Sequence, residues 1–465
     1  MAIATTPADT YSDAVGESPP ADGPLAEGPS ADSPLARLTP EQLEELAKEL
    51  DAIGDEVRAD LGERDAQYIR STIALHRRLV VGARALLTLG SRNRGAWLAG
   101  TAALSVAKIL ENMEIGHNVM HGQWDWMNDP DINSRTWDWD TASPAEAWRH
   151  SHNYEHHTYT NIRGKDRDLG YEIMRIDPQQ KWYPVYLLQP LFNLLLMGFF
   201  EWGVALHDIN YEAIKKGEKS KRQALSELKA IGAKARKQVV KDYIAFPALS
   251  AAVAGAAAAA LTATEEAADR SPATNRFGRS RSAKASAKRG WRRARPGLWP
   301  AASRPKSSVA APVSESAKQA FKATLAADFT ANIVRNVWAH GIIFCGHFPD
   351  QTYTFSQREV ENETRGGWFV RQMLGSANIE GSPLFHFMAG NLSFQVEHHL
   401  YPDMPSSRYA EIAPRVREVC RKYGLPYNTG PLGKQLGTVH RTILRLSLPG
   451  GGPKRRPRPA APGRA

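Results

Sequence analysis

The sequence has little cysteine: only Cys345 and Cys420 occur among its 465 residues. Two cysteines exclude a disulfide framework and a cysteine-rich metal site, and they indicate a reducing environment that faces the cytosol. The sequence also lacks a glycine-rich dinucleotide fingerprint, a haem-binding domain, zinc fingers, RNP motifs and helix-turn-helix patterns. We therefore expect no built-in reductase domain and no binding to nucleic acid.

The two ends of the chain lack apolar periodicity. Residues 1–35 are rich in alanine, proline, serine and aspartate, without the basic start and apolar core of a secretory signal peptide. We expect them to be a disordered N-terminal tail and residues 449–465 to be a disordered basic C-terminal tail, because neither can bury enough apolar surface. Residues 36–448 are expected to form one membrane domain that inserts through internal spans. Order should begin with a helix capped by Thr39 and Gln42.

Several apolar runs approach the roughly 20 residues that a membrane-spanning helix needs. Residues 79–89 and 96–110 indicate a helical hairpin, and residues 183–206, 243–261 and 325–345 are three further candidate spans. The segments before residue 183 and after residue 345 are polar. If both lie on the same side of the membrane, the chain must cross the membrane an even number of times between them. We assign residues 183–206 to an interfacial or re-entrant segment, which leaves about four transmembrane helices.

The net charge of +10 is concentrated near these apolar runs. This position favours an anionic membrane surface over nucleic acid as the partner, and it predicts that the basic residues 215–241 stay cytoplasmic. Residues 262–320 are basic and rich in alanine, serine, arginine and proline, and we expect a disordered low-complexity insertion there. Their predicted outer location conflicts with the positive-inside rule, although long loops can cross regardless of charge. A genuine insertion and an incorrectly translated stretch both remain explanations.

Most histidines fall into three clusters. The first pair is spaced by four residues, which places both imidazoles on one face of a helix, although such a pair alone is as often two polar groups at a helix end. The second cluster packs four imidazoles into eight residues, and the third has two adjacent imidazoles. Their members are His117 and His121; His150, His152, His156 and His157; and His398 and His399.

The clusters indicate a metal centre. Neutral imidazole is the commonest metal ligand in proteins, and the absence of cysteine from every cluster disfavours structural zinc, so iron or another redox metal fits better. One ion accepts about four to six ligands, and three clusters therefore imply two metal ions. A transporter that merely collects imidazoles would instead place ionisable groups along a path near the bilayer midplane.

The spacing and order of these clusters resemble the three histidine boxes of the integral-membrane fatty acid desaturase family. The resemblance covers about residues 40–448. Within it, residues 114–127, 344–350 and 397–402 are most similar to actinobacterial acyl-CoA desaturases of the stearoyl-CoA Δ9 or linoleoyl-CoA type. The resemblance implies an all-α fold, in which an integral membrane bundle of about four transmembrane helices carries a cytoplasmic, histidine-rich di-iron cap.

The resemblance also implies a ligand set for two non-haem iron ions. The histidines at the box positions are His117, His121, His152, His156, His157, His398 and His399. His347 matches a further family histidine, and Gln395 stands where many relatives have histidine. Residues that we expect either to bind metal or to support a ligand are Gln395, His150, Glu397 and Asn391.

By resemblance, the chain is a multi-pass enzyme of the plasma membrane whose active site faces the cytoplasm. It would use O2 and two electrons to introduce a cis double bond into a long-chain acyl-CoA or acyl-lipid, at Δ9 if the substrate is stearoyl- or palmitoyl-CoA. A separate ferredoxin-type donor or NAD(P)H-dependent reductase would supply the electrons. The alternative is a histidine-box membrane hydroxylase.

Four residues near the boxes are weaker candidates for substrate binding. Trp124 and Trp126 could line an acyl-CoA entrance, although tryptophan is also enriched at membrane interfaces as an anchor. Arg163 and Lys165 could meet coenzyme A phosphates, and lipid headgroups are an equal alternative.

Overall fold

The computed structural model describes residues 37–270 and 310–450. Within these ranges the chain is helical apart from two short strands and the connecting loops. The two predicted tails and the central part of the expected insertion lie outside the described residues, apart from the first two positions of the C-terminal tail.

The first half of the described chain contains α2 (Pro40–Ala59), α3 (Glu63–Gly90), α4 (Arg94–Ile109), η3 (Leu110–His117), α5 (Asn118–Met120), η4 (Asp125–Met127), α6 (Ala145–Trp148), η5 (Arg149–His156), α7 (His157–Tyr159), η6 (Leu169–Glu172), η7 (Pro184–Leu188), α8 (Gln189–Gly198), α9 (Phe200–His207) and α10 (Tyr211–Lys216). The second half contains α11 (Lys221–Val239), η8 (Val240–Ala245), α12 (Phe246–Arg270), α13 (Ala310–His347), α14 (Arg365–Gly375), β1 (Asn378–Glu380), α15 (Pro383–Met388), α16 (Gln395–Leu400), η9 (Ser406–Arg408), α17 (Tyr409–Lys422), β2 (Thr429–Pro431) and α18 (Leu432–Ser447).

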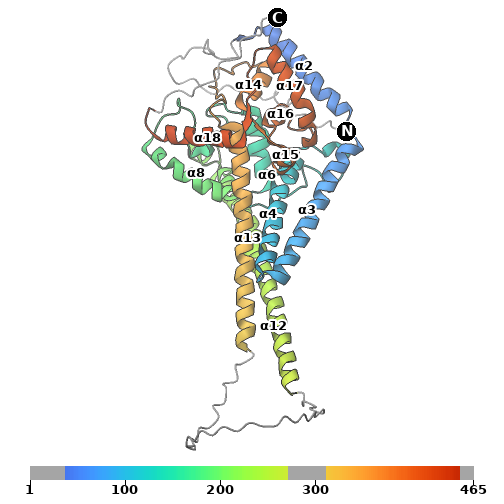
Figure 1. Cartoon of the computed structure of the whole chain (residues 1–465). Helices are drawn as coiled ribbons and strands as arrows, with labels where there is room; N and C mark the ends of the chain where they lie inside the picture. The colour runs from blue at the N-terminus through green and yellow to red at the C-terminus, as the bar shows by residue number, and fades with distance from the viewer. Residues whose placement is uncertain (1–36, 271–309, 451–465) are drawn as a thin grey trace, which may run out of the picture.

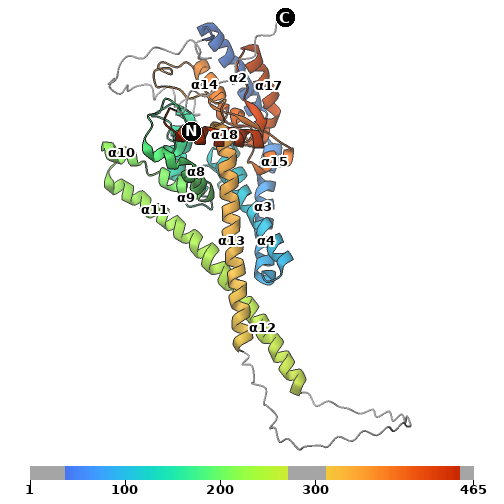
Figure 2. The ribbon, with the colours of Figure 1, turned by 60° about the vertical axis from the view of Figure 1, so that its left-hand side comes forward.

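Four long helices, α3, α4, α12 and α13, form a bundle below a cap made by the shorter elements (Figure 1). The predicted hairpin is confirmed: α3 ends at Gly90, and Asn93 starts α4 by accepting a hydrogen bond from the backbone N–H of Ala96 at 3.0 Å. Figure 2 shows α11 starting beside the cap and running down away from it into α12.

Charged side chains inside the bundle are paired with one another. Arg84 of α3 donates to Asp242 at 3.0 Å and to Asp328 of α13 at 2.5 Å. Lys108 of α4 donates to the other oxygen of Asp242 at 2.7 Å. Because a buried charge is costly unless it is paired, this network fixes how the four helices pack.

Among the described residues, one helix, Lys221–Ala267, is long enough and apolar enough to cross a membrane by itself. A second span results if Pro184–Gly198 and Phe200–Lys216, which are bent by 105° relative to each other, are taken together. This bend lies in the segment that we assigned to an interfacial or re-entrant position. The all-α class is thus observed, whereas length and composition alone identify one or two spans instead of four.

The expected disorder of residues 262–320 is wrong at both ends of that segment. Helix α12 continues to Arg270, and α13 already begins at Ala310. The reason is that alanine is the strongest helix former, and the start of α13 packs against α12 where Val313 and Ala317 face Gly255. The residues between the two helices lie outside the described ranges.

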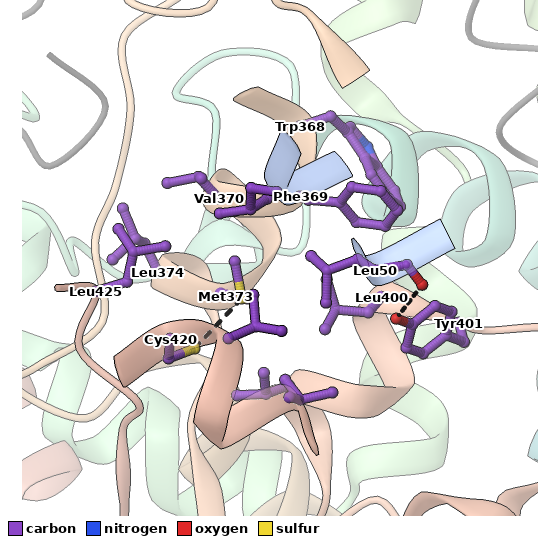
Figure 3. Packing of buried hydrophobic residues seen from close by; sticks show 14 of the residues in the cluster. Leu50, Trp368, Phe369, Val370, Met373, Leu374, Leu400, Tyr401, Cys420 and Leu425 are labelled. Atoms are coloured by element: carbon purple, nitrogen blue, oxygen red, sulfur yellow. Dashed lines mark hydrogen bonds between the residues drawn. The ribbon is translucent and has the colours of Figure 1, made fainter. Parts of the chain in front are cut away.

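A hydrophobic core in the cap holds the third histidine cluster in place. As Figure 3 shows, Leu50 of α2, Met373 of α14 and Cys420 of α17 surround the end of α16. The Tyr401 hydroxyl, just after α16, donates to the Leu50 carbonyl at 2.8 Å. At the start of α2 the predicted capping box is confirmed, with Thr39 and Gln42 each accepting from the other's backbone N–H.

The two strands form a small parallel pair that orients the start of α16. Asn378 of β1 pairs with Thr429 of β2. Its side-chain oxygen accepts from the backbone N–H of Val396 at 2.8 Å, and its side-chain nitrogen donates to Glu397 at 2.8 Å. A single asparagine thus links the strand pair to the helix that carries His398 and His399.

Candidate metal centre

Two of the three histidine clusters lie on π-helical turns. In the first cluster His117 ends η3 and His121 directly follows the short α5, while the second cluster lies along η5 and enters α7. Each widened turn is continuous with an α-helix, and short π-helical turns of this kind are frequent at functional sites. The sequence spacing predicted ordinary α-helix, so this local widening is a correction to that prediction.

The box histidines converge into two buried groups with ligand nitrogens within 4.8 Å of one another. The first group joins all three clusters and contains His117, His121, His152 and His398. The second contains His156, His347 and His399. Residues separated by as many as 281 positions along the chain thus meet in one site.

His157 lies between the two groups. Its ring is stacked on that of His399, with centroids 4.3 Å apart, and its centroid is 4.7 Å from that of His121. Among the described residues, neither of its ring nitrogens has a hydrogen-bond partner, although both are buried. A buried imidazole whose nitrogens have no protein partner is expected where the ring binds a metal ion.

Pairs of ring nitrogens approach each other at the spacing of two ligands on one ion. The Nε2 atoms of His117 and His398 are 3.4 Å apart, and those of His347 and His399 are 3.3 Å apart. Two nitrogens bound at about 2.1 Å and at tetrahedral or octahedral angles lie roughly 3.0–3.4 Å from each other. The buried Nε2 atoms of His121, His152 and His156 also lack a partner within the described part of the chain. The donor set therefore fits metal ions.

The opposite ring nitrogens are held by polar side chains. The Nδ1 of His156 lies 3.1 Å from Asp166, and that of His152 lies 3.4 Å from Asp168. The Nδ1 of His398 lies 3.1 Å from the Tyr409 hydroxyl, and that of His399 lies 3.0 Å from the Gln372 amide oxygen. Such contacts fix the ring orientation and leave Nε2 to face the centre of the site.

The electrostatics keep most of these imidazoles neutral. Burial, with the neighbouring imidazoles, holds the pKa well below its ordinary value for His117, His121, His157, His347, His398 and His399. Burial also acts to lower the pKa of His156, but the adjacent Asp166 and Asp168 carboxylates outweigh it and raise that pKa. The neutral form is the one that binds metal.

Comparison with known proteins agrees with this geometry. The family model described as fatty acid desaturase matches residues 95–264 and 316–431, which is more than half of the chain. The chain belongs to the fatty acid desaturase family. The match to the desaturase family has a gap at residues 265–315, which falls within the basic, low-complexity segment 262–320.

A mycobacterial relative matches most of the length of this desaturase, and other relatives match a shorter part. The desaturase is 44% identical over 414 residues to the "NADPH-dependent stearoyl-CoA 9-desaturase" of Mycobacterium tuberculosis, covering 89% of this chain and 82% of that one. A shorter match, 31% identical over 113 residues, links it to human "Fatty acid desaturase 3" and covers 24% of each chain. No solved structure matches the desaturase.

Gln395 lies beside the second histidine group of the desaturase. Its side-chain nitrogen is 3.0 Å from Nε2 of His347, and its side-chain oxygen is buried with no partner among the described residues. The approach requires Gly346, because a Cβ there would lie 2.9 Å from the Gln395 side chain. The glutamine therefore contacts the candidate ligand set directly, as its position in the third box suggested.

Three other residues that we considered as possible ligands face away from the site. The side chain of His150 is 69% exposed and points toward Glu155. Glu397 accepts hydrogen bonds from Asn378 and from the Tyr427 hydroxyl, at 2.8 and 2.7 Å. Asn391 donates to Glu114 and Tyr68, both at 3.1 Å. Periodicity alone could not separate His150 from its neighbours in the box.

The four residues expected to bind substrate do not line the cavity beside the histidines. Trp124 is fully buried in a separate hydrophobic cluster, and Trp126 donates to the Gln123 carbonyl. Arg163 pairs with Asp177 at 3.0 Å, while the Lys165 ammonium lies over the Tyr159 ring. Each of these side chains packs or pairs within the protein, and its part in substrate binding stays a prediction.

Other aromatic residues line that cavity. Its walls include Trp139, Trp148, Tyr171 and Phe200, together with His117 and His152 from the first histidine group. The volume of the cavity is about 50 Å³. It therefore joins an apolar, aromatic surface to two of the candidate metal ligands.

Sequence reasoning missed several residues that support the histidines. Tyr409 and Gln372 lie far from the boxes in sequence and carry no spacing signal. His207 was assigned no role, yet its Nε2 lies 3.2 Å from Asp168, which also contacts His152. Although burial acts to raise it, the hydrogen bonds from His152 and His207 hold the pKa of Asp168 well below its usual range.

Proposed function

We propose that this desaturase introduces a cis double bond at Δ9 of stearoyl-CoA or palmitoyl-CoA, using O2 and two electrons. The convergence of seven buried or nearly buried histidines into two adjoining groups, with the buried His157 between them, is the observation that carries the proposal. The 44% identity to a relative named as a stearoyl-CoA 9-desaturase supports the choice of substrate and position.

Two non-haem iron ions are the proposed cofactors. His117, His121, His152 and His398 would hold one ion, and His156, His347 and His399 the other, with His157 between them. Bound iron would supply the redox chemistry that activates O2 toward an unactivated methylene. The protein's own contribution is to keep the imidazoles neutral, to orient them through outer hydrogen bonds and to exclude bulk water.

The cavity beside the first group is the proposed place of the reacting methylenes. The rings of Trp139, Trp148 and Phe200 line it together with His117 and His152, and the Trp148 ring is stacked on that of His152. Because the chemistry at each methylene of an acyl chain is the same, position along the cavity decides which carbon faces the metal ions.

The bundle of α3, α4, α12 and α13 is the proposed membrane anchor, which makes four crossings of the plasma membrane. Exposed apolar side chains cover its surface at Leu89, Leu98, Leu249 and Phe329. The charged residues within it are paired, as a membrane interior requires. The basic helix α11 adjoins the cap, so the histidines would face the cytoplasm.

Electrons are proposed to come from a separate ferredoxin-type protein or NAD(P)H-dependent reductase. The sequence contains no dinucleotide fingerprint. The similar mycobacterial protein is named as NADPH-dependent, which fits a route from NADPH through a partner.

Expression in a desaturase-deficient host tests the proposal. Fatty acids would be analysed by gas chromatography and mass spectrometry, with derivatives that locate double bonds. The wild-type chain should yield a new Δ9 monoene, His157→Ala should yield none, and His150→Ala is the matched control because that exposed histidine lies outside the metal groups. A hydroxylated product, or equal activity in the two variants, would contradict the proposal.

A further inference from the structure

Reduction of O2 by this enzyme consumes protons that must reach a buried site. In the proposed reaction, an acyl CH2–CH2 unit, O2, two electrons and two protons give a CH=CH unit and two molecules of water. The two hydrogens removed from the acyl chain and the two protons from solvent together make both waters. Because the histidine groups are buried, the solvent protons require a route through the protein.

Two cavities meet at one aspartate. The inner cavity is the one that reaches His117 and His152. The outer pocket is larger, about 580 Å³, and lies between η5, the loop that follows α9, and α11. Of the residues that the structure describes, only Ser151 and Asp208 line both.

Asp208 is connected by hydrogen bonds at both carboxylate oxygens. The Ser151 hydroxyl donates to Oδ1 at 2.7 Å, and the Ser143 hydroxyl donates to Oδ2 at 2.9 Å. Ser143, like Asp208, lines the inner cavity. The carboxylate and the two hydroxyls thus form a continuous hydrogen-bonded link between the two cavities.

We propose that Asp208 is a proton-relay residue, which takes protons from the outer pocket and passes them through Ser143 and Ser151 to the inner cavity beside the first histidine group. Each transfer moves one proton from the carboxyl group toward the inner cavity, and the carboxylate is protonated again from the outer pocket. No electron is exchanged at Asp208. The relay rests on the proposed reduction of O2 by this enzyme.

The charge environment of Asp208 suits such exchange. Burial raises the pKa of its carboxyl to about 6, while hydrogen bonds from Ser151 and Ser143 and the adjacent His207 act to lower it and Asp168 acts to raise it. A group of this pKa gains and loses protons readily near neutral pH. The charged or titratable residues around the outer pocket are Glu146, His150, Glu155, Arg167, Glu218, Lys219 and Glu227.

The alternative is that Asp208 has only a structural role and holds η5 against the loop that follows α9. Asp208→Asn separates the two roles because the amide has nearly the same shape and can still bond to both serines, but cannot carry a proton. Glu146→Gln is the matched control, since Glu146 is exposed and lines only the outer pocket.

The experiment measures O2 consumption and product formation by the iron-loaded enzyme with a reduced donor, in H2O and in D2O, across a range of pH. We expect Asp208→Asn to lower kcat on the order of tenfold or more, to leave KM and iron content unchanged, and to increase the solvent isotope effect. Ser151→Ala should shift the isotope effect in the same direction, and Glu146→Gln should match the wild type.

Three outcomes would overturn the relay: a wild-type solvent isotope effect in Asp208→Asn, unaltered kcat, or loss of kcat in proportion to lost iron. A wild-type enzyme that makes an alcohol instead of an alkene would refute the proposed desaturation alone, because hydroxylation also consumes two protons per O2. A wild-type enzyme that consumes no O2 would refute both.

Discussion

The Nδ1 atom of His156 lies 3.1 Å from Oδ1 of Asp166, and this contact orients the one candidate ligand whose pKa is raised. Asp166 also accepts hydrogen bonds from the backbone N–H groups of Asn161 and Asp168, at 2.7 and 3.0 Å. The carboxylate is thus fixed by the loop that follows the second histidine box, and it fixes His156 in turn.

Replacement of Asp166 should weaken metal binding. Asp166→Asn keeps the shape of the side chain but removes the charge that favours a basic, correctly oriented imidazole. We expect metal affinity to fall roughly 10- to 100-fold, measured as iron content against chelator concentration. Glu155→Gln is the control, because Glu155 contacts Arg167 and the exposed His150 instead. Equal iron retention in both variants would contradict the assigned role of Asp166.

Gly346→Ala should disturb the second histidine group. The added Cβ would lie 2.9 Å from Gln395, which contacts His347, so the glutamine must move. We expect lower iron content and a stability loss of about 1–3 kcal/mol from overpacking. Gly341→Ala on the same helix is the control, since its Cβ would meet only Leu436, at 3.9 Å. Full iron content in Gly346→Ala would show that Gln395 does not support the site.

Glu114 should make stability depend on pH. Burial raises its pKa to about 8, even though hydrogen bonds from Ser406, Tyr68 and Asn391 act to lower it. Since the folded state holds this proton more tightly than the unfolded state does, its contribution to stability is complete below the unfolded pKa. The contribution declines as the pH rises toward 8, by at most about 1.4 kcal/mol per pH unit.

Glu114→Gln cannot titrate and should lose less stability over that range. The measurement is the Tm of the metal-free protein in detergent from pH 5 to pH 9, compared with the wild type, because bound cations would favour the carboxylate. A wild-type Tm that stays parallel to that of the variant, or rises relative to it, would show that the folded state does not hold the Glu114 proton more tightly than the unfolded state does.

Motif spacing predicted much of the candidate site. The box histidines meet because each cluster lies at the end of a long helix or on a short element packed beside it, a consequence of local periodicity. His347 was expected only from the resemblance, since a lone histidine at the end of an apolar run has no spacing signal. The hairpin between α3 and α4 followed from a break in an apolar run.

Other features depend on tertiary structure and could not be predicted. The exposure of His150 follows from the direction of one π-helical turn. The burial of Trp124 and the position of Asp208 between two cavities follow from packing between distant segments. The helical ends of the insertion followed from alanine content, which outweighed the low complexity of that segment.

The most direct test of the central claim is to supply ¹⁸O2 to the purified, iron-loaded enzyme with stearoyl-CoA and a reduced donor, and to analyse the acyl product by mass spectrometry. The account predicts a Δ9 monoene that contains no ¹⁸O, because both oxygen atoms leave as water. An acyl product that carries ¹⁸O as a hydroxyl group would contradict it and would identify a hydroxylase.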